Sequence, residues 1–284
     1  MIGEAGSAPV LGNRQPGGEG INVETLALRH LAVHISTCPN VDICLSDDRL
    51  EHPCSVVVRQ NNPSRYSPRA LPEPWYGHLG SARILFVSSN PGGGHAKSEP
   101  DSDDPKDILQ RAEDAFEGLT LKDFGRYWLR IQNLAEELLG TSGGPVQPGV
   151  DYAITEVVHC GSAGEAEGNV GRAVLECGPR YTPLLLRLSP ATVIVAVGSI
   201  ARDWFSNHLR LAPPLGLRQV GGPMEIEGRS RLLLSVANPS ARSTAPKGFD
   251  LAQITAAREH LAQTPSASPP TQRPNSTCRR EGPA

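Results

Sequence analysis

The stretch ILFVSSNPGGGHAKSEP, residues 84–100, runs from a short apolar segment directly into a turn rich in proline and glycine. Three more β-branched runs follow along the chain. Together the four runs span residues 83–88, 152–158, 192–197 and 231–236. Each run is almost continuously apolar, as expected of strands that are buried on both faces of a parallel sheet.

Helical patterns alternate with these predicted strands. Apolar residues recur at helical spacing over residues 23–36, 124–139, 170–188, 200–208 and 251–262. Such alternation is typical of a parallel sheet with helices on both sides. We therefore predict an α/β fold, a three-layer α/β/α sandwich around a central, mainly parallel, four-stranded sheet. Ligands bind such folds beyond the carboxyl ends of the strands, so the residues that follow each strand carry most information about function.

The composition limits the folded part of the chain. Only 38% of the 284 residues are hydrophobic, whereas 29 are glycine and 26 are proline. Residues 1–20 are rich in glycine and proline, and residues 263–284 form a segment rich in proline, serine and arginine. We expect one folded domain over residues 21–262, between two disordered tails at 1–20 and 263–284.

The charge and hydropathy of the chain restrict its partners and compartment. A formal net charge of −3 excludes a basic field over the whole protein, although one local face can still bind DNA. The sequence shows no secretion signal and no apolar run of membrane-spanning length. We expect a cytoplasmic monomer that does not bind membranes.

The glycines before Lys97 and Ser98 invite comparison with a nucleotide-binding phosphate loop. That motif requires G-x-x-x-x-G-K-[ST], but Pro91 and Ala96 occupy the two glycine positions. The acidic, proline-bracketed residues that follow do not resemble a helix N-terminus, where a phosphate would bind. We therefore reject the phosphate-loop interpretation.

Six cysteines without a secretion signal indicate metal or redox chemistry before disulfides. Cys38 and Cys44 bracket a short segment after the first helical pattern, Cys160 follows the second strand, and Cys177 lies in the next helical pattern. Four thiolates from these places suit either zinc or an iron–sulfur cluster. The alternative is that they are ordinary buried thiols. Cys54 has no obvious partner, and whether it replaces Cys44 stays open.

The order of these elements resembles the uracil-DNA glycosylase superfamily, and more specifically its iron–sulfur-containing branch. The similarity extends from about residue 26 to residue 240. It rests on four cysteines in the right order between the right strands, on VVHC at 157–160 and on SPATVIVAVGSIA at 189–201. The resemblance implies a [4Fe–4S] cluster bound by Cys38, Cys44, Cys160 and Cys177, with zinc as the alternative cofactor.

Two short motifs look more like the mismatch-specific and single-strand-selective members of that superfamily. Ser88-Ser89-Asn90-Pro91-Gly92 is similar to their G-x-N-P-G, whose asparagine positions the water that attacks the sugar. Asn238-Pro239-Ser240 stands where the superfamily usually has His-Pro-Ser, whose histidine steadies the departing base. The resemblance implies catalytic roles for Asn90 and Asn238, and substrate binding by Ser88, Ser89, Pro91, Gly92 and Ser240. For Asn90 alone, a simple turn-forming role before proline is the alternative.

The remaining candidate substrate-binding residues come from three other segments. Glu156 replaces the family's base-reading asparagine. It could accept a hydrogen bond from a base N–H or amino group, or instead form a salt bridge at the strand end. Tyr127, or else Phe124, matches the family's stacking aromatic, unless both only pack at the start of a core helix. Arg242, in the loop after the last motif, is a candidate for DNA contact.

These residues together lead us to expect a DNA repair glycosylase. It would flip one base out of DNA and hydrolyse the N-glycosidic bond of uracil or another deaminated or mismatched base. One alternative is a catalytically weak or inactive DNA- or lesion-binding protein with the same fold and cluster, because the motif histidine and the base-reading asparagine are replaced. Another is a zinc-stapled nucleoside-binding protein without DNA activity.

Overall fold

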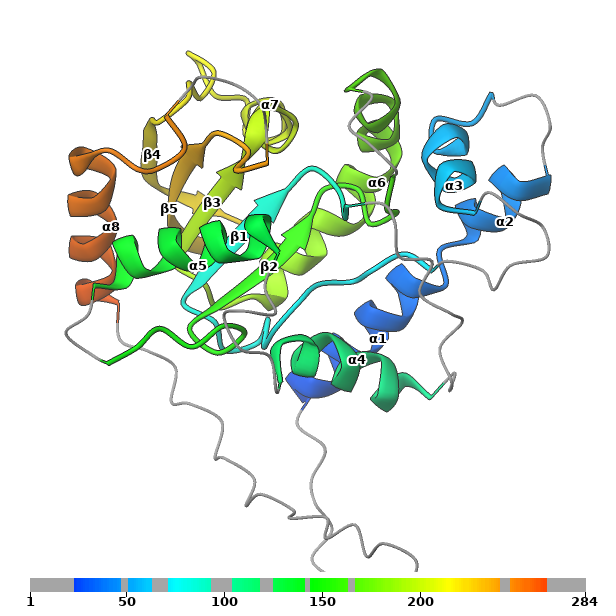
Figure 1. Ribbon diagram of the computed structural model, residues 1–284, viewed down its shortest axis with the longest axis horizontal. Coiled ribbons are helices and arrows are strands. Elements are labelled where there is room, and N and C mark those ends of the chain that lie inside the picture. The colour runs from blue at the N-terminus through cyan, green and yellow to red at the C-terminus, as the bar shows by residue number, and fades with distance from the viewer. Residues whose placement is uncertain are drawn as a thin grey trace, which may run out of the picture.

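The computed structural model describes residues 23–46, 51–62, 71–92, 104–117, 125–140, 144–162, 167–240 and 246–264 (Figure 1). Its strands form one five-stranded sheet with the order β2-β1-β3-β5-β4. The strands are β1 (Ile84–Ser88), β2 (Tyr152–Glu156), β3 (Val193–Val197), β4 (Val220–Ile226) and β5 (Arg229–Val236). The first four strands in the spatial order run parallel, and β4 pairs antiparallel with β5 at the edge.

The α/β class and the mainly parallel sheet are confirmed, but the prediction of four strands was wrong. The additional strand is β4, whose sequence VGGPMEI lacks the continuous β-branched pattern of the others. Glycine and proline weaken a strand interior, and proline is tolerated only at edges and bulges. The β4–β5 register accordingly shifts between Gly221 and Met224, on either side of the proline.

Helices cover the sheet, and five of them were predicted to within a few residues. These are α1 (Val23–Ser36), α5 (Arg126–Leu139), α6 (Glu167–Leu188), α7 (Gly198–His208) and α8 (Leu251–Gln263). Three shorter helices were not predicted, namely α2 (Pro39–Ser46), α3 (Ser55–Asn61) and α4 (Pro105–Glu113), the last followed by the 3₁₀ turn η1 (Asp114–Phe116). None of the helices that the structure describes is long and apolar enough to cross a membrane.

The strands divide their side chains between two hydrophobic cores, one on each face of the sheet. Leu85 and Val87 of β1 join a core with helices α1, α2, α3, α4, α6 and α7. Ile84 and Phe86 join a second core with α5 and α8, which Figure 1 shows together on one side of the sheet. This two-residue alternation is the period of a β-strand. It determines on which face each residue near a strand end lies.

An extended segment, residues 71–76, covers the outer edge of β2. The backbone N–H of Tyr76 donates to the Ile154 carbonyl at 2.8 Å, and the N–H of Ile154 donates back to Tyr76 at 3.0 Å. Farther along, Glu73 N–H donates to the His159 carbonyl at 2.9 Å. The segment therefore satisfies backbone groups that an open edge would leave exposed.

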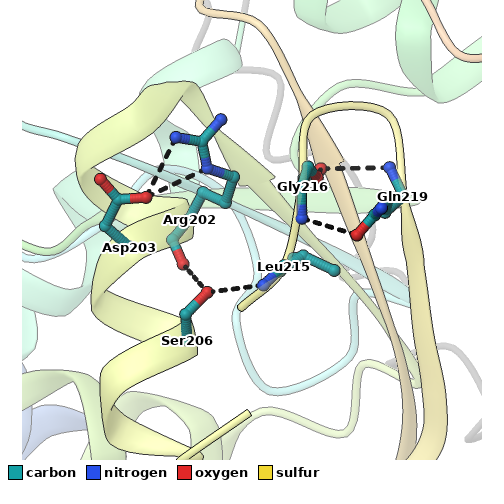
Figure 2. Close-up of polar contacts among 7 residues, drawn as sticks. Arg202, Asp203, Ser206, Leu215, Gly216 and Gln219 are labelled. Atoms are coloured by element: carbon teal, nitrogen blue, oxygen red, sulfur yellow. Dashed lines mark hydrogen bonds and ion pairs between the residues drawn. The ribbon is translucent and has the colours of Figure 1, made fainter. Parts of the chain in front are cut away.

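The loop between α7 and β4 is fixed to α7 by a serine hydroxyl (Figure 2). Ser206 donates its hydroxyl to the Arg202 carbonyl at 2.9 Å and accepts the Leu215 backbone N–H at 3.0 Å. The next residue, Gly216, donates its N–H to the Gln219 side-chain oxygen at 2.7 Å. Ser206 lies two turns into α7, away from the carboxyl end of β3.

Two predictions about the chain ends lie mostly outside the described residues. Residues 1–20 and 265–284 are not described, so the two disordered tails stay predictions. The C-terminal helix ends at Gln263, one residue beyond the predicted domain boundary.

Candidate functional site

The parallel strands β1, β2, β3 and β5 end at the same edge of the sheet. The segments that leave this edge contain Asn90, Ser162, Gly198 and Asn238. The fold thus brings the two predicted catalytic asparagines to one edge, from strands that are separated by β3. In open α/β sheets, this edge is where ligands bind.

The carboxamide of Asn90 is held by three hydrogen bonds. Its Nδ2 donates to the Pro91 carbonyl at 3.0 Å and to the Ser162 hydroxyl at 2.8 Å. Its Oδ1 accepts the Ser89 hydroxyl at 3.3 Å. A carbonyl can only accept, so the contact with Pro91 determines which end of the amide is nitrogen. The orientation of the carboxamide is therefore fixed by the loop around it.

The loops after β1 and β2 run side by side and continue the pairing of the two strands. Val157 N–H donates to the Ser88 carbonyl and Val158 N–H to the Ser89 carbonyl, both at 3.0 Å. Farther along, Gly92 and Ser162 form a parallel bridge. Ser88 and Ser89 are buried, as is Pro91, whereas Gly92 is exposed. Asn90, half-buried, is thus presented by two mutually supporting loops.

The strand alternation places Glu156 on the α5 side of the sheet. Tyr152 and Ile154 of β2 belong to the core with α5 and α8, so Glu156, two residues farther, lies on the same face. Its side chain is almost completely buried, with only 2% of the residue exposed. Tyr127, at the start of α5, packs against this same core. Glu156 and the predicted stacking residue therefore share one face of the sheet.

The loop after β5 is ordered by a turn and by two basic side chains. Asn238 Oδ1 accepts the Ser240 backbone N–H at 2.8 Å. The Arg130 guanidinium of α5 donates to the Pro239 carbonyl, and Lys247 Nζ donates to the same oxygen at 3.2 Å. Ser240 itself is exposed. This loop consequently carries local positive charge, although the whole chain is slightly acidic.

Gly198, at the end of β3, lies directly against Asn238. Its φ is +86°, a left-handed conformation that favours glycine. A Cβ added there would lie only 3.3 Å from the Asn238 Cβ. The glycine in this predicted V-A-V-G-S segment thus has a packing role beside the candidate site.

Two predicted site residues, Phe124 and Arg242, lie outside the described residues. Their roles in base stacking and DNA contact stay predictions.

On the other face of the sheet, four cysteines line one cavity. They are Cys38 between α1 and α2, Cys54 just before α3, Cys160 after β2, and Cys177 within α6. Apolar side chains make up most of the remaining wall, together with His159 and Tyr181. Three of the four predicted thiol ligands therefore meet here, and Cys54 joins them in place of Cys44.

Cys44 is buried but does not line this cavity. Its Sγ lies 3.3 Å from Nδ1 of His52, and the same nitrogen accepts the backbone N–H of Cys54 at 3.1 Å. An imidazole nitrogen that accepts from a backbone N–H carries no proton of its own. Any hydrogen bond in the contact with Cys44 therefore has the sulfur as its donor.

Burial disfavours the charged form of three cavity thiols, those of Cys54, Cys160 and Cys177. It raises the pKa of Cys54 to about 12 and raises the pKa of Cys160 and Cys177 well above the ordinary thiol value. Repulsion from the neighbouring thiolates adds to the effect at each of the three. Without a positive centre between them, these three groups are neutral thiols at pH 7. A bound metal group would reverse this balance, because its charge stabilises thiolates.

His159 is one of three residues with polar side chains in the cavity wall besides the cysteines, with Asn40 and Tyr181. Its Nδ1 lies 2.7 Å from the Glu73 carbonyl, which requires a proton on Nδ1. Burial lowers the pKa of His159 to about 4, against the opposing effect of that hydrogen bond, so the ring is neutral. In the described part of the chain, the buried Nε2 has no hydrogen-bond partner. The backbone N–H of His159 points at Cys177 Sγ at 3.4 Å, as donors to cluster sulfurs do.

Within the same described residues, no three His, Cys, Asp or Glu side chains form a group that could hold a single metal ion. The donor set of the cavity is nonetheless chemically suitable for a thiolate-bound group: four cysteines, an apolar wall and a backbone N–H aimed at a sulfur.

Sequence reasoning left Cys54 as an open alternative to Cys44, because the helices α2 and α3 on either side of Cys54 were not predicted. It did not identify Ser162 as a site residue, because the contact of Ser162 with Asn90 depends on how the loops after β1 and β2 align.

No protein-family model matches the chain, and no curated protein matches it significantly. The interpretation of the site therefore depends on its residues and their geometry.

Proposed function

We propose that this protein is a DNA glycosylase that hydrolyses the N-glycosidic bond of uracil or another deaminated or mismatched base. One observation carries the proposal: a neutral carboxamide, that of Asn90, is held in a fixed orientation at the carboxyl end of a central strand. It lies at the same sheet edge as Asn238, beyond the carboxyl ends of parallel strands, where open α/β sheets bind ligands.

Glycosidic hydrolysis needs groups that this edge can supply. Positive charge develops on the sugar and negative charge on the departing base. Asn90 Oδ1 would orient the attacking water, because a carbonyl oxygen can accept a hydrogen bond beyond the one from Ser89. The Asn238 amide would donate to the departing base. Glu156 would accept from a base N–H or amino group, with Tyr127 as the stacking surface.

The local charge at the β5 loop supports a DNA partner. Arg130 and Lys247 both reach the Pro239 carbonyl, so two cations lie beside the Asn238 turn. Phosphate contacts from such side chains position a protein on DNA without reading its sequence. A flipped base would then approach Asn90 and Asn238 from the side of the loop after β5.

The cavity thiols would hold the cofactor, which we propose to be a [4Fe–4S] cluster. Cys38, Cys54, Cys160 and Cys177 would be its ligands. Four thiols spread over the wall of a cavity suit a [4Fe–4S] cluster, in which each cysteine binds a different iron atom. A single zinc ion would instead need all four sulfurs about 2.3 Å from one point. When bound, the cluster would staple α1, α3 and α6 to the end of β2. It would lie across the sheet from Glu156, so its role is structural.

A second candidate is a DNA- or lesion-binding protein with little catalysis. It is favoured by the engagement of Asn238, whose Oδ1 closes a turn with Ser240. A neutral amide so constrained stabilises a departing anion less well than a cationic donor does.

A base-release assay distinguishes the two candidates. The purified protein would be incubated with single- and double-stranded oligonucleotides that carry uracil, hypoxanthine or xanthine, and alkali-labile abasic sites would be counted. The glycosylase proposal predicts abasic sites in at least one substrate. Retained DNA binding without abasic sites in any substrate would favour the binding protein instead.

A further inference from the structure

Ser162 contacts the Asn90 side chain, whose orientation determines where the proposed attacking water would lie. Its hydroxyl oxygen accepts from Asn90 Nδ2 at 2.8 Å, the shortest of the three hydrogen bonds to that carboxamide. Ser162 comes from the loop after β2, whereas Pro91 and Ser89 are neighbours of Asn90 in the chain. It is also buried, with 3% of the residue exposed.

We propose that Ser162 is a positioning residue that fixes the Asn90 carboxamide so that its Oδ1 can orient the water that attacks the sugar. The inference rests on the proposed function of Asn90, but its geometric part stands independently of that function. Both Nδ2 hydrogens are used, one by Pro91 and one by Ser162, so the amide plane is set from two sides. Oδ1 is then held where it can accept from a water.

The backbone around Ser162 makes this contact rigid. Ser162 N–H donates to the Pro91 carbonyl at 3.3 Å, and the same residue forms a parallel bridge with Gly92. The side-chain and backbone contacts thus tie the same two loops together. A carboxamide held only by its own chain neighbours could rotate about χ2, which is a soft torsion for asparagine.

Loss of the hydroxyl should therefore lower the rate of the chemical step more than substrate binding. Misplacement of a catalytic group by about 1 Å can cost about 100-fold in rate. Removing one of three hydrogen bonds permits partial misplacement, and we expect a loss of about tenfold in kcat. KM should change by less than about twofold, because the buried Ser162 exposes almost no surface to a substrate.

The experiment compares Ser162→Ala with Ser162→Thr, which keeps the hydroxyl. The first measurement is the rate of single-turnover excision. The second is the NMR signal of the Asn90 side-chain amide in protein labelled with ¹⁵N-asparagine. Ser206→Ala is the matched control, because Ser206 is another buried serine whose hydroxyl bonds a loop outside the site (Figure 2). The proposal predicts a tenfold loss for Ser162→Ala, substantial recovery for Ser162→Thr and an unchanged rate for Ser206→Ala. The Asn90 side-chain amide signal should shift and exchange faster only in Ser162→Ala.

A wild-type rate of single-turnover excision in Ser162→Ala, or an Asn90 amide signal that does not change in that variant, would overturn the proposal. Equal losses in Ser162→Ala and Ser162→Thr would also contradict it, since the hydroxyl would then not be what matters. If the wild-type protein releases no base, the proposed function fails, and the amide signal alone decides whether Ser162 orients Asn90.

Discussion

The Cys44 sulfur lies 3.3 Å from His52 Nδ1, and that nitrogen also accepts the Cys54 backbone N–H. This relationship distinguishes two cysteines that the sequence alone cannot separate. Cys44 turns its sulfur toward His52, while Cys54 lines the cavity with Cys38, Cys160 and Cys177. The His52 ring thus holds the start of α3 in the position from which Cys54 reaches the cavity.

On the proposed cluster assignment, Cys54→Ser should lose most of the iron, whereas Cys44→Ser should retain it. A serine hydroxyl is a much poorer cluster ligand than a thiolate, but at position 44 it can still donate to His52. The measurements are iron and sulfide content and the visible absorption of protein purified without oxygen. Loss of iron in Cys44→Ser with retention in Cys54→Ser would reverse the assignment. A colourless, zinc-loaded wild-type protein would contradict the cluster.

Replacement of Asn238 should change excision in either direction, depending on the new side chain. Asn238→Ala removes the proposed donor to the departing base and should lower the single-turnover rate by about tenfold. Asn238→His supplies a donor that can become cationic and should raise the rate above wild type, because charge-assisted hydrogen bonds are stronger. Equal rates in all three proteins would remove Asn238 from the mechanism.

Gly198→Ala should destabilise the protein and disturb Asn238. The positive φ and the 3.3 Å approach to the Asn238 Cβ both oppose a side chain. We expect the free energy of unfolding to fall by about 1–3 kcal/mol, measured by urea denaturation. Gly171→Ala is the control, because Gly171 lies in α6 with nothing within 4 Å of an added Cβ. That variant should gain up to about 1 kcal/mol, and an equal loss in both would refute the packing argument.

The stability should depend on pH through His78. The Glu113 carboxylate raises the pKa of His78 above its ordinary value of 6.5, against burial, which lowers it. The protonated ring is therefore more favourable in the folded state. Its contribution is fully present below pH 6.5 and is lost as the pH rises through the higher folded-state pKa.

The test is the difference in unfolding free energy between wild type and His78→Gln. Because the pair is partly exposed, the difference should be less than about 1 kcal/mol, and it should be larger at about pH 6 than at about pH 8. A difference that grows with pH would contradict this sign.

The sequence predicted the elements that have strong periodic patterns. The four parallel strands were predicted from nearly continuous apolar runs. α1 was predicted with its exact bounds because its apolar residues keep helical spacing over fourteen residues. β4 was missed because Gly221, Gly222 and Pro223 interrupt any strand pattern. Helices α2 and α3 have only eight and seven residues, too few for a period to be evident.

The candidate site was predicted only where residues follow a strand. Asn90 and Asn238 were named because they follow predicted strands and stand in motifs that resemble those of a known family, and their catalytic roles stay predictions. Ser162 could not be found, since its contact depends on the alignment of two loops. Cys54 could not be preferred to Cys44, since the choice depends on which way α2 and α3 turn their thiols. The role of Ser162 and the choice of Cys54 over Cys44 both depend on how segments distant in sequence pack together, which a local sequence pattern does not show.

The most direct test of the account is to identify the products that wild type and Asn90→Ala form from the preferred substrate. We predict that wild type releases the intact free base and leaves an abasic site in an unbroken strand. Asn90→Ala should bind the same DNA within about twofold but release base at least about 100-fold more slowly. Wild-type rates of base release by Asn90→Ala would contradict the account, because the water would then be positioned by another group.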